Sequence, residues 1–310
     1  TILPEFEAEY QAIPVLAERY PTLEALVAAE PDFTYGRGSA YGLGEDGVAS
    51  VEQLAELGIQ AYIVQGTLVE AGTMEDVYTD IHNLGQIFDI QPRAEELIQS
   101  MQAEISAIQE QIGDVDAPVR VLVYDAGTDD LFTAGQSLQT HLISLAGGEN
   151  VFGDVEANWT TVSWEEAVAR EPEVIVINDY GEVSLAEKIS FLENNPALSS
   201  MPAIQNKRFV AISLPSVFEG VRNPDAIRTL AEGFYPEKFA EGAAPAASTS
   251  GFPVTINNCG IKITYDAPPQ RAVSMNQSTT EIMLKLGLQK QMAGTANLVD
   301  AILPELEAGY

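Results

Sequence analysis

Residues 92–112 have the sequence PRAEELIQSMQAEISAIQEQI, and this stretch decides the fold. It opens with a proline at a first-turn position, where the missing N–H costs a helix nothing. A helix of this length would be about 31 Å long at 1.5 Å per residue. The helical pattern begins earlier, at residue 74, with a break expected near residues 89–92. The stretch 74–112 is therefore predicted to be a helical connector that includes a stiff backbone helix.

Short strands alternate with helices on both sides of this connector. Strands are predicted at 32–35, 60–64, 119–124, 173–178 and 208–213. Helices are predicted between them, at 22–29, 51–57, 138–145, 164–169, 186–193 and 224–233. Such alternation is typical of parallel sheets covered by helices. The predicted fold class is α/β, with two parallel-sheet lobes joined by the long helix.

A predicted linker, followed by the predicted start of the first lobe, lies late in the sequence. Residues 239–251 are dominated by small residues, with proline and serine but no apolar periodicity, and predict a flexible tether. After it, 252–265 predicts a β-hairpin, 271–275 a strand, and 278–281 the cap of a helix. The first lobe is therefore predicted to combine 252–310 with 1–73, and the second lobe to span 113–238. That order predicts a circularly permuted chain.

The two ends of the sequence carry nearly the same decapeptide. Residues 1–10 are TILPEFEAEY and residues 301–310 are AILPELEAGY, identical at seven positions. The two copies cannot both occupy the same structural position in one molecule. Three origins remain open: a permuted chain with an overlap, a unit from a tandem repeat of two binding proteins, or segments that exchange between protomers. The last would give head-to-tail self-association through 1–10 and 301–310.

Composition limits the partners. The chain is acidic, with 46 Asp and Glu residues against 15 Lys and Arg and a formal net charge of −31, which argues against nucleic-acid binding. No apolar run of about 18 residues predicts a membrane span. Cys259 is the only cysteine, and His82 and His141 the only histidines, so no metal site with tight nitrogen and sulfur spacing is expected.

Enzyme motifs are also missing from the sequence. Gly36 and Gly38, with Gly42, match a dinucleotide fingerprint poorly, and no nucleophile elbow or phosphate loop occurs. The acidic loop 125–130 lacks the glycine and the terminal glutamate of a calcium-binding loop, so a solvated turn is expected there. We therefore predict no enzymatic activity and no intrinsic cofactor.

Several separated motifs carry a resemblance to a known family. They are AVSMNQSTTE at 272–281, PTLEALVAAEPD at 21–32, FTAG at 132–135, AGGENVF at 146–152 and VSWEE at 162–166. With the long connecting helix, they resemble the helical-backbone substrate-binding proteins of ABC importers for iron-siderophores, haem and cobalamin. The order departs from the family, because the family's N-terminal part, here 252–310, follows its C-terminal lobe.

The resemblance implies an extracytoplasmic protein, whether periplasmic, lipid-anchored at the cell surface or secreted. It would capture a metal chelate in a cleft between its lobes and deliver the chelate to an ABC permease. The alternative is a structural or filament-forming assembly subunit built on the same fold, with segment exchange between protomers.

Candidate ligand-binding residues follow from both the resemblance and the fold. In open parallel sheets, ligands sit outside the carboxyl ends of the strands. Aromatic side chains in those loops offer flat surfaces to a macrocycle, and two loop arginines favour an anionic chelate unless they form ordinary ion pairs. Tyr35, at a strand end, is expected to pack in the core. The predicted set is Arg37, Tyr41, Asn276, Gln277, Asn297, Trp159, Tyr180, Phe218 and Arg222.

The resemblance also implies two carboxylates that would meet arginines of the permease, one on each lobe. The matching residues are Glu24 and Glu165, with Glu281 and Glu166 as the nearest alternatives. Both predicted residues lie in first helical turns, where an acid is also explained by the helix dipole. Both interpretations stay open at this point.

Overall fold

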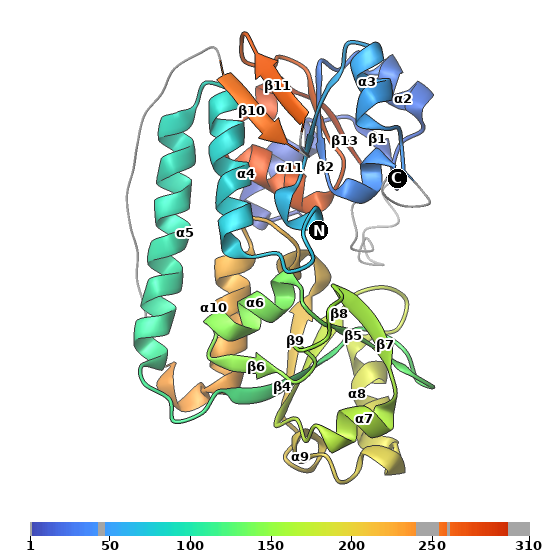
Figure 1. The fold of residues 1–310 in the computed structure, drawn as a ribbon, viewed down its shortest axis with the longest axis vertical. Coiled ribbons are helices and arrows are strands. Elements are labelled where there is room, and N and C mark those ends of the chain that lie inside the picture. The colour runs from blue at the N-terminus through green and yellow to red at the C-terminus, as the bar shows by residue number, and fades with distance from the viewer. Residues whose placement is uncertain (1, 43–46, 240–253, 259–260, 297–310) are drawn as a thin grey trace.

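The structure is a computed structural model that describes residues 2–42, 47–239, 254–258 and 261–296. It has two lobes, one above the other in Figure 1, and the long helix α5 (Gln91–Ile112) runs along one side of both. Helix α4 (Met74–Ile87) packs against α5. In the described part of the chain, no helix is both long and apolar enough to cross a bilayer.

The first lobe is built on a five-stranded parallel sheet. Its order is β1 (Val15–Ala17), β13 (Met292–Ala296), β12 (Ala272–Ser274), β2 (Phe33–Gly36) and β3 (Gln60–Ile63). Val273 on β12 lies opposite Thr34 on one side and Gly294 on the other. Strands from late in the sequence therefore lie between strands from its beginning.

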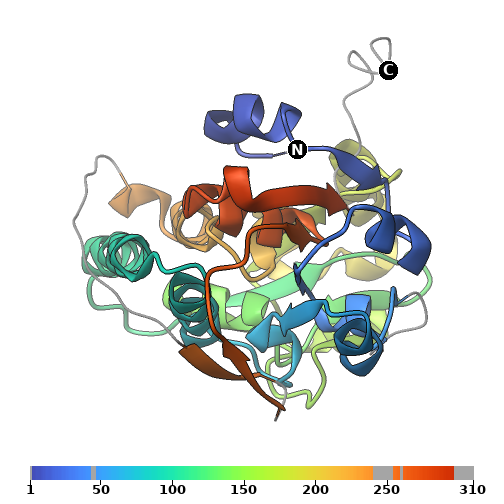
Figure 2. The ribbon, with the colours of Figure 1, turned by 90° about the horizontal axis from the view of Figure 1, so that it is seen from above.

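Helices and a hairpin cover this sheet. They are α1 (Glu7–Gln11), α2 (Leu23–Ala28), α3 (Val51–Glu56) and α11 (Gln277–Lys285), with the hairpin β10 (Val254–Asn258) and β11 (Ile261–Tyr265). Figure 2 shows α1, in dark blue, on the α11 side of the sheet. Two contacts agree with that view: the Leu3 amide donates to Glu281 at 3.1 Å, and Lys285 pairs with Glu5 at 3.1 Å.

The second lobe has a four-stranded parallel sheet in the order β6 (Gly148–Asn150), β4 (Val119–Tyr124), β8 (Val174–Asp179) and β9 (Phe209–Ser213). Strands β5 (Leu131–Ala134) and β7 (Trp159–Val162) form a separate antiparallel pair. Strand β8 is buried from Val174 to Asn178, as expected for a parallel strand covered on both faces. The α/β prediction is confirmed.

The helices of the second lobe are α6 (Leu138–Leu145), α7 (Trp164–Ala169), α8 (Leu185–Asn194), α9 (Pro202–Gln205) and α10 (Asn223–Phe234). Short 3-10 turns connect elements in both lobes: η1 (Pro4–Phe6), η2 (Gly38–Tyr41), η3 (Gln65–Thr67), η4 (Pro196–Leu198), η5 (Leu214–Val217), η6 (Pro236–Lys238) and η7 (Gln289–Gln291).

The connector breaks where the sequence predicts. Asp89, between α4 and α5, has a positive φ of 56°, a conformation that ends a helix. The two helices then pack so closely at Gly85 that an added Cβ would lie 2.4 Å from the Ala94 Cβ. Helix α5 buries Ile98, Met101, Ile105, Ile108 and Ile112, whose three- and four-residue spacing forms one apolar face. That face belongs to a core cluster continuous through both lobes.

Helix α11 begins earlier than expected. Its N-cap is Asn276, whose Oδ1 accepts a hydrogen bond from the Thr279 amide at 2.9 Å, rather than a residue of 278–281. Thr279 completes the capping box with Asn276. Asn276 therefore caps the helix in place of Ser278, the first residue of the predicted capping pattern. The correction places 277–281 inside the helix, where all five residues are buried.

Candidate functional site

The two lobes meet through residues 218–222, which we call the interlobe loop. It follows β9 and η5 of the second lobe and leads into α10. A Cβ added at Gly66, just after β3, would lie 2.8 Å from the Glu219 side chain, and one added at Gly220 would lie 3.1 Å from the Ser278 Cβ. Loops at the carboxyl ends of strands from both sheets therefore touch.

Arg37 reaches across this boundary from the end of β2. Its Nη1 donates to Glu219 Oε2, and its guanidinium lies 4.3 Å from the centre of the Phe218 ring. The Arg37 side chain is 23% exposed and that of Glu219 only 5%. The Gly38 amide donates to the Thr67 hydroxyl at 2.9 Å, which fixes the loop that carries Arg37.

Arg222 crosses in the opposite direction. Its Nε donates to Glu281 Oε2 at 2.7 Å, and its Nη2 donates to Glu281 Oε1. A guanidinium that meets both oxygens of a carboxylate forms one of the stronger protein ion pairs. Both arginines of the predicted site therefore form ion pairs with glutamates of the other lobe, Glu219 and Glu281, neither of which was among the predicted ligand-binding residues.

A polar cluster holds Tyr180 in place at the ends of β4 and β8. The Tyr180 hydroxyl donates to Asp125 Oδ2 at 2.5 Å, and Lys188 Nζ lies 4.8 Å from the Tyr180 ring. Lys188 also donates to the carbonyl oxygens of Asp125 at 2.7 Å and Asn178 at 2.6 Å. Burial, followed by the hydrogen bond to Asp125, raises the pKa of Tyr180, and burial lowers the pKa of Lys188. The phenol therefore stays neutral at physiological pH.

Trp159 belongs to an aromatic stack. Its ring lies on that of Phe132, with centroids 5.7 Å apart and planes 22° apart. The two residues are diagonal neighbours on the β5–β7 pair, because Phe132 lies opposite Thr161 and Trp159 opposite Ala134. Phe132 is 36% exposed and was absent from the predicted set. Its place in the FTAG motif was the signal that could have identified it.

Other predicted residues lie deeper. Tyr41 is 3% exposed in the first-lobe core, where its hydroxyl donates to the Tyr62 carbonyl at 3.2 Å and burial raises its pKa. Tyr35 is fully buried, as expected. Asn276 caps α11 and Gln277 is 1% exposed. Asn297 lies outside the described residues.

Glu24 and Glu165 are exposed and occupy equivalent positions in their helices. Each is the second residue of a six-residue helix, α2 or α7. Thr22 caps α2 and Ser163 caps α7, each through its hydroxyl. The two alternatives are engaged elsewhere: Glu166 pairs with Arg170 at 2.9 Å, and Glu281 is the buried partner of Arg222.

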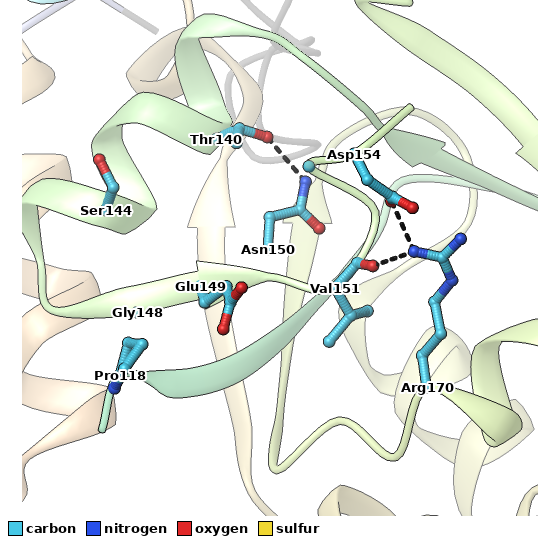
Figure 3. A pocket seen from close by; sticks show the side chains of 10 residues that line it. Pro118, Thr140, Ser144, Gly148, Glu149, Asn150, Val151, Asp154 and Arg170 are labelled. Carbon is cyan, nitrogen blue, oxygen red and sulfur yellow. Dashed lines mark hydrogen bonds and ion pairs between the residues drawn. The ribbon is translucent and has the colours of Figure 1, made fainter. Parts of the chain in front are cut away.

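An open pocket of about 640 Å³ lies on the surface of the second lobe and not at the interlobe loop. Figure 3 shows Arg170 at its edge, donating to Asp154 and to the Val151 carbonyl, each at 2.5 Å. The predicted ligand-binding residues do not line it. Among the residues that the structure describes, no cluster of three or more His, Cys, Asp or Glu could hold a metal ion.

Comparisons with known proteins give the family. A model of the periplasmic binding protein family matches residues 4–214. YvrC, an ABC transporter substrate-binding lipoprotein of Bacillus subtilis, is 22% identical over 76% of this chain and 72% of its own length. The vitamin B12-binding protein of Yersinia pestis is 29% identical, but the match spans only 45% of this chain and 47% of that protein.

Solved structures agree on the fold. A periplasmic binding protein from Veillonella parvula superposes with a TM-score of 0.71 at 28% identity, over 76% of this chain and 81% of the other. A structure described as an ABC-type Fe³⁺-hydroxamate transport system, from Saccharomonospora viridis, has a TM-score of 0.60 at 22% identity, over 76% of this chain and 83% of the other. These matches do not support the alternative of an assembly subunit, and they do not show a permuted order. The chain belongs to the periplasmic binding protein family, which comprises substrate-binding proteins of ABC transporters and not enzymes.

Proposed function

We propose that this protein captures a metal chelate at the boundary between its lobes and delivers it to an ABC permease outside the cytoplasm. One observation carries the proposal. Loops at the carboxyl ends of strands in both parallel sheets meet at the interlobe loop, where Arg37 after β2 contacts Glu219 after β9. Ligands of open parallel sheets bind at that end of the strands. The protein would be periplasmic, anchored at the cell surface or secreted, as family members are.

The chelate would be of the iron-siderophore, haem or cobalamin type. The names of the relatives support that class, and so do the aromatic side chains near the boundary. Trp159 and Phe132 offer a stacked pair, Phe218 lies under Arg37, and Tyr180 is fixed by Asp125. Rings of this kind bind flat or macrocyclic ligands. We leave Tyr41 out of the proposed contacts because its ring is in the core.

Mass spectrometry of the native protein, together with its absorbance spectrum, tests this proposal by identifying any retained ligand. Calorimetric titrations with cyanocobalamin, ferrichrome and haemin would follow. We expect at least one chelate to bind with a Kd of about 1 μM or lower. The proposal fails if no chelate copurifies and none of the three binds at concentrations up to roughly 100 μM.

We also propose that the sequence order is permuted, so that the first lobe combines 252–310 with 1–73. Support comes from β12 and β13, which lie inside the sheet next to β2 and β1. A protease site introduced into 240–251 tests the arrangement. After cleavage, the two fragments should elute together in gel filtration under native conditions, because parallel strands inside one sheet hold them together. Fragments that separate would contradict it.

A further inference from the structure

Two ion pairs cross the lobe boundary in opposite directions. Arg37 of the first lobe pairs with Glu219 of the second, and Arg222 of the second lobe pairs with Glu281 of the first. The glutamate side chains are 5% and 1% exposed, so water screens neither charge well. Each arginine therefore already has a counter-ion within the protein before a ligand arrives.

The geometry of the two ion pairs makes it difficult for an anionic ligand to compete with the glutamates for the arginines. Arg222 gives both Nε and Nη2 to the two oxygens of Glu281. Arg37 gives Nη1 to Glu219, while its guanidinium is covered by the Phe218 ring. An anionic group that approached either arginine would meet a carboxylate that is already buried beside it. Displacing that carboxylate would leave it buried without a partner, which is the costly way to break such a pair.

The segments that follow the strands carry more negative charge than positive charge. These segments, some of which run into the next turn, helix or strand, are 35–41, 66–68, 125–132, 158–159, 179–181, 215–222 and 276–278. They contain two arginines, Arg37 and Arg222, and five acids, Asp125, Asp129, Asp130, Asp179 and Glu219. Lys188 lies beside Asp125 but is buried and donates to two carbonyl oxygens. Its positive charge therefore offsets little more than the negative charge of Asp125.

We infer that the interlobe site takes metal chelates that carry no net negative charge, because Glu219 and Glu281 neutralise the two arginines that would otherwise attract an anion. The inference rests on the proposed function. It reverses the expectation from sequence that two loop arginines favour an anionic chelate. A neutral or positive chelate can contact the aromatic rings without breaking either ion pair, and it meets no repulsion from the acidic loops.

Matched probes that share one chelate core and differ in charge test the inference on the full chain by calorimetry at low salt. Ferrioxamine B is singly positive, its N-acetyl derivative neutral and its N-succinyl derivative singly negative, on one ferric trihydroxamate core. Cyanocobalamin is neutral, and hydrolysis of one propionamide gives a singly negative partner. In whichever series binds, we expect the negative probe to bind at least about tenfold more weakly than its neutral counterpart.

Variants identify the residue responsible. Glu219→Gln removes the carboxylate that pairs with Arg37. It should reduce the difference in Kd between the neutral and negative probes to about threefold or less. Glu193→Gln is the matched control, because Glu193 pairs with the exposed Lys207 on the surface of the second lobe. Circular dichroism checks folding, and the wild-type series stands as a test even if the Glu219 variant misfolds.

The outcomes separate this inference from the proposed function. A negative probe that binds wild-type protein as tightly as its neutral counterpart overturns the charge preference while leaving the binding function intact. A folded Glu219→Gln protein with an unchanged difference in Kd overturns the role of Glu219. If no probe binds and no chelate copurifies, both the proposed function and this inference fail.

Discussion

Arg222 and Glu281 join the two lobes through a bidentate ion pair in which Nε lies 2.7 Å from Oε2. Arg222 directly precedes α10 of the second lobe, and Glu281 lies in α11 of the first. The Glu281 side chain is 1% exposed, and its Oε1 also accepts the Leu3 amide at 3.1 Å. One carboxylate therefore connects α10, α11 and the N-terminal segment that packs on α11.

Removing Glu281 should destabilise the protein strongly. Glu281→Ala leaves Arg222 and the Leu3 amide without this acceptor, and breaking one side of a buried pair costs about 3–5 kcal/mol. Urea unfolding measures the loss, and the double variant with Arg222→Ala should lose less than the two single variants together. The control is Lys285→Ala, because the exposed pair with Glu5 contributes at most about 1 kcal/mol. Equally small losses of stability in Glu281→Ala and Lys285→Ala would contradict this account.

Asp80 should make stability depend on pH. It is fully buried on α4, where its carboxylate accepts from the Tyr62 hydroxyl at 2.9 Å and from the Gln65 amide at 3.1 Å. Burial raises the pKa of Asp80 well above its ordinary value, against the smaller opposing effect of these hydrogen bonds. The folded state therefore holds the proton more tightly than the unfolded state. Its contribution to stability is present below about pH 4 and is lost as the pH rises through the folded-state pKa.

Asp80→Asn tests this directly, because the amide oxygen can still accept while the charge is gone. Relative to wild type, the variant should gain stability as the pH rises from about 4 to 8, by about 1.4 kcal/mol for each unit by which folding raises the pKa. Unfolding in urea at several pH values gives the difference. Glu110→Gln, at an exposed position on α5, should show no comparable trend. A difference that is constant with pH would refute the prediction.

The long and strongly patterned elements followed from the sequence because each carries its own local signal. Strand β4, helix α6 and helix α7 have the residue bounds that the apolar patterns predict. Strands β1, β5, β6, β7 and β13 were missed. Strand β13 has the sequence MAGTA, whose alanines and glycine have low strand propensity, and it is held in the sheet by neighbours on both sides.

The site was predictable only in part. The positions of Arg37 and Arg222 after strands placed them at the lobe boundary, but their partners depend on how the lobes meet. Glu219 is 182 residues from Arg37 and Glu281 is 59 from Arg222, so no local pattern reveals either pair. The same holds for Phe132 and Trp159, whose stacking depends on the register of two strands.

Tryptophan fluorescence should report ligand binding through Trp159 alone. The chain has two tryptophans, and Trp164 is 5% exposed with its indole N–H donating to the Thr128 carbonyl at 3.1 Å. In a Trp164→Phe protein, a bound chelate should quench Trp159. Trp159→Ala should weaken binding by about 1–3 kcal/mol, the free energy typical of covering one aromatic ring with a ligand. Binding that is unchanged in Trp159→Ala would remove this residue from the site.

Permease docking should depend on Glu24 and Glu165 without affecting ligand capture. Both carboxylates are exposed on the first turns of α2 and α7, so reversing their charge should leave the fold and the Kd for the chelate unchanged. In proteoliposomes containing the permease, Glu24→Lys and Glu165→Lys should each reduce chelate uptake by about tenfold or more, because a lysine would repel the arginines that the family resemblance leads us to expect on the permease. Glu56→Lys, at the exposed end of α3, controls for a change in net charge and should transport normally. Equal uptake by all three variants would exclude these two glutamates as docking residues, and a parallel loss of chelate affinity would instead place them in the ligand site.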